Sequence, residues 1–381
     1  MSVCDIGKEN GWLRALGSVA AFVLIVGGLS TAGSGVSRAQ SGGGGHRGYV
    51  DGGNLVSHGV EPSSSAGLFS GIERGASDAA ATARGRASVT AAGLEVRVKG
   101  KEKPEKFASP DAAVAALMEA LRADDPQRLE AIFGVQQELI SSGDPVADRA
   151  LRQRFLQAYE NRHSLGGVEA GMVTLTVGQN EWPFAVPIVE SKEGFYFNAA
   201  AGANEVVFRR VGRNELAAIE VCREYVGAQE EYASVGHDGQ PPGQYAQKLM
   251  SDTGKQNGLY WPVREDQLRS PAGPLLASAQ SEGYSAATAG RSTPYHGYLY
   301  VPLRKQNANA SGGAKNYIDD KGTQTGGFAL LAYPADYGRS GVKSFMVNQD
   351  GVVFEKDLGK RTPEVAPRIT EFDPKGWSPV R

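Results

Sequence analysis

Residues 344–354 read SFMVNQDGVVF, and this stretch gives the clearest indication of the fold. Apolar residues flank Asp350-Gly351, and an Asp-Gly pair between alternating apolar residues is the strongest short-range signal for a β-hairpin. We therefore predict a strand over residues 342–347, a turn, and a returning strand over 352–354. Two earlier apolar stretches extend the prediction to an antiparallel meander, namely 298–303 and 328–333.

A helix is predicted to precede this sheet. Gly212-Arg213-Asn214 offers an asparagine as the capping residue, and apolar residues then recur at helical spacing as far as Tyr232. The apolar stripe consists of Ala218, Val221, Cys222, Tyr225, Ala228 and Tyr232. A loop rich in Gly and Pro follows, with a second, short helix predicted over 245–250. The sequence from there to Pro294 shows little pattern.

Three helices are predicted earlier in the chain, each from the same start signal. A capping side chain followed by proline suits a helix N-terminus, because proline lacks the N–H that would be unpaired there. The three signals are Ser109-Pro110-Asp111, Asp125-Pro126 and Asp144-Pro145. After the first signal, four apolar residues at i, i+3, i+4 and i+7 form one face: Val114, Leu117, Met118 and Leu121.

The pattern then changes to one typical of strands, predicted over 172–177, 182–188, 195–197 and 206–208. Pro183 and Pro187 favour an edge position for the second strand, since proline cannot donate to a neighbouring strand. Gly194 lies in the turn before the third. Helices followed by an antiparallel sheet define an α+β fold rather than a doubly wound one.

We therefore predict two α+β domains, the first over residues 107–211 and the second over 212–381. Residues 40–106 are rich in Gly, Ser and Ala without helical or strand periodicity, and are predicted to be a disordered linker. With 50 glycines among 381 residues, many turns are expected. The net charge is −2 with interspersed signs, so no nucleic-acid partner is predicted.

Residues 1–39 have the anatomy of a secretory signal peptide. Lys8 and Arg14 precede an apolar run over 15–29, and Ser37-Arg38-Ala39 offers small side chains for cleavage. Fifteen helical residues, at about 1.5 Å each, fall short of the ~30 Å hydrocarbon core of a bilayer. We predict a periplasmic or secreted protein without a stable membrane span after cleavage. The alternative is an inner-membrane anchor through residues 15–29.

No residue pattern points to catalysis, a metal or a cofactor, so the chain is predicted not to be an enzyme. It lacks the spacings typical of zinc sites, serine-hydrolase elbows and phosphate-binding loops. After signal cleavage Cys222 is the remaining cysteine, and it lies on an apolar stripe that indicates packing. An envelope hydrolase remains an alternative, and it requires a nucleophile near His163, His237 or His296.

Aromatic residues are the predicted binding candidates. In the first domain, a sheet closed by helices could enclose a small ligand, and the candidates to line such a pocket are Trp182, Phe184 and Phe195. In the second, the candidates lie in loops and at strand entry: Tyr260, Trp261, Tyr295 and Tyr298. The alternative for this second group is that it closes the core of the domain.

Nearly the whole chain after the linker resembles a bacterial family of exported proteins described only as domain of unknown function 2950. The matching stretches are Ser142-Gly143-Asp144-Pro145, Trp182-Pro183, 215–232, 258–262, Tyr295-His296-Gly297-Tyr298 and 344–351. This resemblance implies an architecture and no activity.

Each half also has a looser likeness. The first resembles the cone-shaped fold of nuclear transport factor 2, and the second resembles the soluble head of type IV pilins and pseudopilins. A pilin helix continues from an N-terminal anchor, whereas here a predicted domain intervenes, which argues against incorporation into a pilus. We expect a non-enzymatic binding or scaffolding protein of the envelope, with an envelope protein or polysaccharide as partner.

Overall fold

The computed structural model describes residues 103–135, 140–167, 171–262, 269–273 and 293–380, together with Leu275, Ala279 and Tyr284. The predicted signal peptide, and the predicted linker up to residue 102, lie outside these residues. The described part combines helices with antiparallel sheets, which confirms the α+β class. None of the helices described in it is both long and apolar enough to cross a membrane.

The three predicted N-terminal helices are present: α2 (Pro110–Arg122), α3 (Pro126–Phe133) and α5 (Pro145–Asn161). Each begins with proline, and the side chain before it caps the helix. Ser109, Asp125 and Asp144 accept hydrogen bonds from backbone N–H groups of the first turn at 3.0–3.1 Å. The sequence signal and the observed caps therefore agree, because the cap supplies acceptors that the helix itself cannot.

Two three-stranded sheets follow these helices. One has the order β1-β3-β4 and the other β2-β5-β6. Their strands are β1 (His163–Leu165), β2 (Met172–Val173), β3 (Leu175–Val177), β4 (Trp182–Pro183), β5 (Ile188–Ser191) and β6 (Gly194–Phe197). The prediction of one strand over 172–177 is thus wrong, since this segment contributes to both sheets. The predicted strand over 182–188 is also divided, although Pro183 does lie on the edge strand β4.

The helix α6 (Ala199–Ser234) is longer than predicted and begins about 15 residues earlier in the chain. The predicted strand over 206–208 is helical, and the helix begins at Ala199 rather than near Asn214. Asn198 caps it, accepting from the Ala201 N–H at 3.1 Å. One buried stripe then continues through the predicted domain boundary between residues 211 and 212. Its first four members recur every four residues, at Ala199, Ala203, Val207 and Val211.

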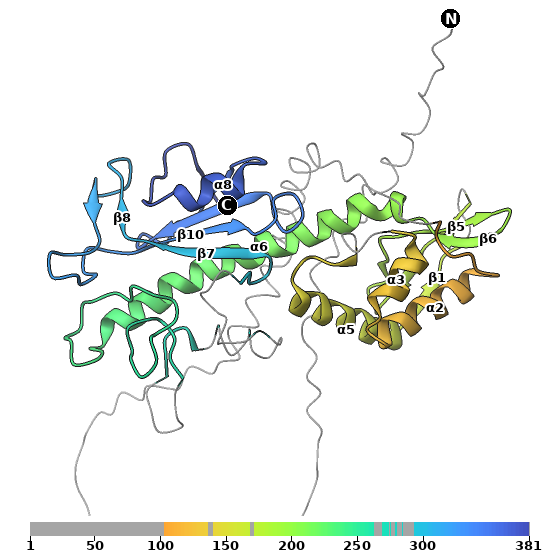
Figure 1. Cartoon of the computed structure of the whole chain (residues 1–381), viewed down its shortest axis with the longest axis horizontal. Coiled ribbons are helices and arrows are strands. Elements are labelled where there is room, and N and C mark those ends of the chain that lie inside the picture. The colour runs from red at the N-terminus through yellow and green to blue at the C-terminus, as the bar shows by residue number, and fades with distance from the viewer. Residues whose placement is uncertain are drawn as a thin grey trace, which may run out of the picture. The chain divides into compact units, whose positions relative to one another are not determined.

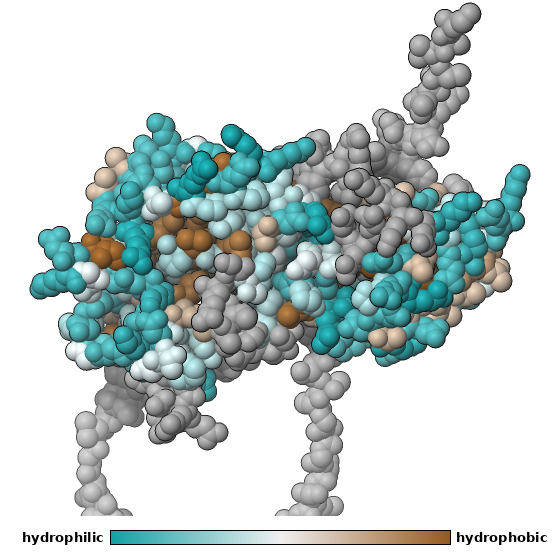
Figure 2. Space-filling model, in the orientation of Figure 1, coloured by the Kyte–Doolittle hydropathy of each residue, from teal (hydrophilic) through white to brown (hydrophobic). Residues whose placement is uncertain are grey.

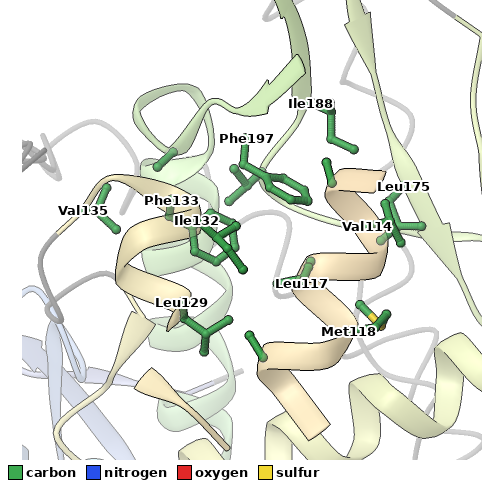
Figure 3. Packing of buried hydrophobic residues seen from close by; sticks show 14 of the residues in the cluster. Val114, Leu117, Met118, Leu129, Ile132, Phe133, Val135, Leu175, Ile188 and Phe197 are labelled. Carbon is green, nitrogen blue, oxygen red and sulfur yellow. The ribbon is translucent and has the colours of Figure 1, made fainter. Parts of the chain in front are cut away.

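The first hydrophobic core lies between α2, α3 and the strands around them (Figure 3). Leu117 and Met118 of α2 and Ile132 and Phe133 of α3 are buried there with side chains from β5 and β6. Phe197 is fully buried, and its ring centroid lies 5.3 Å from that of Phe133. The start of α6 adds Ala199 and Ala203 to the same core.

The C-terminal half contains a five-stranded antiparallel sheet of order β13-β12-β11-β10-β7. Its strands are β7 (Tyr298–Leu303), β10 (Ala329–Pro334), β11 (Lys343–Asn348), β12 (Phe354–Asp357) and β13 (Ser378–Pro379). The predicted meander and its hairpin are therefore confirmed, although the returning strand begins at Phe354 rather than at residue 352. The Gly351 N–H donates to the Asn348 carbonyl at 3.0 Å, and Gly351 has φ +73°, as this turn requires. A small pair of strands lies beside the sheet, β8 (Lys305–Gln306) and β9 (Lys315–Asn316).

Both faces of this sheet are covered. The later part of α6 packs on one face (Figure 1), and its Cys222 and Tyr225 belong to the same buried cluster as Phe345 and Val347 of the sheet. The other face is covered by α8 (Thr362–Val365), the 3-10 helix η3 (Ala366–Arg368) and the segment after it. Because β10 is covered on both faces, all six of its residues are buried.

The predicted helix over 245–250 is wrong, because the backbone there is bound to distant parts of the chain. The Tyr245 N–H donates to the Gln324 carbonyl at 2.8 Å, and the Ala246 N–H donates to the side chain of Gln229 at 2.9 Å. On the surface, hydrophilic residues predominate over α2 and α5, whereas apolar side chains reach the surface near β7 and β10 (Figure 2).

Gly212 tests the continuity of α6, because it lies at the predicted domain boundary. A methyl group added there meets no atom within 4 Å, so we expect Gly212→Ala to raise the free energy of unfolding by about 1 kcal/mol. Gly202→Ala, on the same helix, should lower it, because the new Cβ would lie 2.6 Å from the Ala185 carbonyl oxygen. Urea unfolding measures both. A loss of stability in Gly212→Ala would contradict a helix at this position.

Candidate functional site

The aromatic residues predicted to line a pocket in the first half are partly buried and pack against its core. The Phe184 ring centroid lies 5.3 Å from that of Phe155 and 6.1 Å from that of Phe197. Trp182 lies under the guanidinium of Arg209, which is 4.4 Å from the ring centroid. Phe195 is partly buried and pairs through its backbone with Phe107. A ligand pocket lined by Trp182, Phe184 and Phe195 stays a prediction.

The second aromatic group is divided between two places. Trp261 is 5% exposed and packs edge-on against Tyr232 and His237. Tyr298 is fully buried, and its hydroxyl donates to the Lys343 carbonyl at 2.8 Å. Both belong to the second core, as the packing alternative requires. Tyr260 forms a backbone bridge with Met250.

Tyr295 belongs to a separate aromatic group with Tyr284, His296 and Tyr300. Its ring centroid lies 4.9 Å from that of Tyr284 and 4.3 Å from that of His296. His296 has φ +47°, a backbone conformation that is uncommon for residues other than glycine. This group lies next to the polar cluster described below, because the Tyr284 hydroxyl also donates to Asp144, the capping residue of α5.

The other two candidate histidines have oxygen partners that are not nucleophiles. His163 stacks on Tyr159, and its Nδ1 lies 2.9 Å from the Tyr159 carbonyl oxygen. His237 stacks on Tyr232, with Nε2 3.0 Å from the Tyr232 carbonyl oxygen and Nδ1 3.3 Å from Oε1 of Gln256. These contacts hold the rings against their aromatic neighbours and give no support to a hydrolase centred on either histidine.

A group of buried and half-buried polar side chains lies around the middle of α6, and the sequence pattern did not predict it. We call it the junction cluster. Its members come from α5, α6, the segment before β7 and the loop between β10 and β11: Asp144, Asp148, Arg210, Arg213, Asn214, Glu215, Tyr284, Asp336, Arg339 and Ser340. Buried ionisable groups need partners, because leaving water carries a large cost in free energy.

Two side chains of α6 bind the loop before β11. Glu215 is 5% exposed, and its Oε1 accepts from the backbone N–H groups of Val342 at 3.0 Å and Lys343 at 2.9 Å. Asn214 donates from Nδ2 to the Ser340 carbonyl at 2.8 Å. Gly297 lies so close that a Cβ there would meet Asn214 Nδ2 at 2.6 Å, and it has φ +73°. Glycine is therefore required at this position.

Two aspartates connect the cluster to the start of α5. Asp148 accepts from the Ser141 hydroxyl at 2.8 Å and from the Ser142 N–H at 2.9 Å. Asp144 caps α5 with one oxygen and accepts from the Tyr284 hydroxyl with the other, at 2.6 Å. The cluster thus joins segments that lie more than 100 residues apart in the sequence.

Two arginines of the cluster, Arg210 and Arg213, are poorly hydrated. Arg210 is 6% exposed, and burial lowers its pKa while the nearby Asp148 opposes that shift. Burial lowers the pKa of Arg213 to about 10, and three other arginines lower it further, with Asp148 as the opposing charge. The cluster therefore combines poorly hydrated guanidinium groups with the carboxylates of Asp144, Asp148, Glu215 and Asp336.

These features define an α+β protein whose two hydrophobic cores share one long helix, with a charged cluster at the middle of that helix. Two of the stretches that carry the family resemblance contribute to the cluster, through Asp144 and Glu215, and a third packs closely against it at Gly297. The family model described as "Protein of unknown function (DUF2950)" matches residues 104–380, and the chain belongs to this family. No curated protein matches the chain, and no solved structure matches it. The likenesses to a cone-shaped fold and to a pilin head stay predictions.

Glu215 tests the structural role of the junction cluster. Glu215→Ala removes the acceptor of two backbone N–H groups, and we expect the free energy of unfolding to fall by about 2–4 kcal/mol. Glu215→Gln keeps an oxygen in place and should lose less. Glu220→Ala, at an exposed position of the same helix, is the matched control and should change stability by no more than about 0.5 kcal/mol. Equal losses in Glu215→Ala and Glu220→Ala would contradict the role given to Glu215.

Cys222 tests the packing of α6 on the five-stranded sheet. Burial raises the pKa of its thiol to about 12, so the reactive thiolate is disfavoured in the folded protein. In a Cys4→Ser chain we expect no alkylation by iodoacetamide at pH 8 under native conditions, and complete alkylation in denaturant. Mass spectrometry measures the modification. Rapid labelling of the native protein would show that the helix does not cover Cys222.

Proposed function

We propose that this chain is exported and acts as a non-enzymatic binding or scaffolding protein of the bacterial envelope. The observation that carries the proposal is the way α6 holds the two cores together. A helix of 36 residues contributes to both cores, and buried hydrogen bonds at its middle fix the loop between β10 and β11. Such a rigid framework suits recognition, because little conformational freedom is lost when a partner binds.

The proposal of export comes from the N-terminal sequence. Residues 1–39 combine basic residues, a short apolar run and small residues before the expected cleavage point. The predicted linker over 40–106 would then form the N-terminal part of the mature chain, ahead of the folded part. We expect the partner to be an envelope protein or a polysaccharide.

Cell fractionation with N-terminal sequencing tests export. We expect the protein in the periplasm or the medium, beginning at or near Gln40. An intact chain in the inner membrane would show that residues 15–29 act as an anchor and are not removed with a signal peptide. An intact chain in the cytosol would refute export. A variant in which three apolar residues become charged should not be exported; its changes are Val23→Asp, Leu24→Arg and Ile25→Asp. The same kinds of change at exposed positions of α6 should leave export intact.

A further inference from the structure

The outer edge of β7 is closed at its two ends and open between them. β7 is the last strand of the five-stranded sheet, where β10 is its neighbour. At the start of β7, Tyr298 exchanges backbone hydrogen bonds with Tyr295 across a tight turn, at 2.9 and 3.0 Å. Just after the end of β7, the Arg304 carbonyl accepts from the Tyr317 N–H at 2.9 Å. Both closures use backbone groups that point away from β10.

The alternation of hydrogen bonds along β7 shows which groups remain between these closures. In an antiparallel pair, successive residues of a strand direct their N–H and C=O groups to opposite sides. The Ala335 N–H donates to the Gly297 carbonyl in the β7–β10 register, whereas the backbone groups of Tyr298 point outward. The outward set therefore continues with Tyr300 and Pro302. Among the residues that the structure describes, none accepts from the Tyr300 N–H, and none donates to the carbonyls of Tyr300 and Pro302.

This open edge has little of the protection that folded proteins usually give to an edge strand, namely charge, proline or a very short strand. The opposite edge of the sheet is protected, because β13 has two residues and one of them is Pro379. In contrast, β7 has six residues without a charge, YLYVPL, and Pro302 protects one position. Residues 299–302 are half-buried, and apolar side chains reach the surface near them (Figure 2). The edge thus offers unpaired backbone groups beside apolar side chains.

We propose that the open edge of β7 binds an extended segment of a partner protein, which adds a strand antiparallel to β7. One residue of the segment faces Tyr300 and exchanges both hydrogen bonds with it, and a second donates to the Pro302 carbonyl. The inference deepens the binding role proposed above and rests on it. It selects a protein rather than a polysaccharide, because alternating N–H and C=O groups of a strand are complementary to another polypeptide backbone.

Charge and size define the partner further. Arg304 follows the open stretch, is exposed, and makes no ion pair with the residues that the structure describes. An acidic residue at the N-terminal end of an antiparallel segment would lie beside it, so an acidic end is favoured. A second copy of this chain fits less well, since the open stretch covers only residues 299–303. An interface between two folded chains typically buries ~1,600 Å² in total, whereas a slender segment needs only the edge.

Amide exchange, measured by NMR on the purified full chain, tests first whether the edge is open. The Tyr300 N–H should exchange at least about tenfold faster than those of Leu299 and Val301, which point to β10. Slow exchange of the Tyr300 N–H in the free chain would show that the edge is already covered, and this result would overturn the proposal.

A synthetic peptide then tests docking. The probe is acetyl-Asp-Thr-Val-Thr-Val-Thr-amide, in which the second valine faces Tyr300 when the aspartate lies beside Arg304. At ten times its Kd, the peptide should slow exchange of the Tyr300 N–H by roughly tenfold. The matched control is the same peptide with a methyl group on the backbone nitrogen of the second valine, which cannot donate to the Tyr300 carbonyl. Absent protection, or equal protection by both peptides, would overturn the proposal.

A charge reversal tests the acidic end of the segment. Arg304→Glu should weaken binding of the peptide at least about threefold, and replacing the aspartate of the peptide by lysine should restore it. Arg223→Glu reverses the same charge at an exposed position of α6 and should leave the affinity unchanged. An unchanged affinity in Arg304→Glu would overturn the assignment of an acidic partner.

Sedimentation with purified peptidoglycan separates this inference from the proposed function. A chain that binds peptidoglycan but not the peptide keeps the binding role and overturns the site at β7. Export fails separately as well, because a cytosolic chain that binds the peptide refutes export alone.

Discussion

One constraint governs much of this structure. The buried polar groups at the middle of α6 must have hydrogen-bond partners. Glu215 is 5% exposed, and two hydrogen bonds from backbone N–H groups offset the cost of burying its carboxylate. Those N–H groups belong to Val342 and Lys343, where the chain leads into β11. The loop position then determines where β11 enters the sheet. Since β11 packs on the later part of the same helix, the hydrophobic contacts of Cys222 and Tyr225 depend on a polar contact two to three turns earlier.

The fold was predictable where the signal lies within a few neighbouring residues. Capping side chains followed by proline located the three N-terminal helices, and the Asp-Gly turn located the hairpin after β11. The prediction failed at residues 199–213, where β-branched residues at 206 and 207 favour a strand locally. Buried residues every four positions, beginning at Ala199, carried the opposite signal. The two patterns overlap over residues 206–208, and packing against both cores favours the helix.

The junction cluster could not be predicted from the sequence, for a different reason. Its helical residues have the composition of a solvated helix face, and their burial comes from segments about 70 and 125 residues away. The sequence did bring the aromatic candidates to attention, yet Trp261 and Tyr298 serve the core. The cluster consists of charged and polar residues from distant segments, so it becomes visible only when the folded structure brings these segments together.

The central claim is that α6 is one uninterrupted helix that belongs to both cores, and amide hydrogen exchange tests it most directly. Peptides covering residues 206–218 should exchange slowly, at rates similar to those of residues 219–229, because the same helix and the same buried contacts protect both segments. Fast exchange confined to residues 206–214, with slow exchange on either side, would show two separate helices joined by a flexible boundary. That result would contradict the shared helix and the rigid connection between the cores.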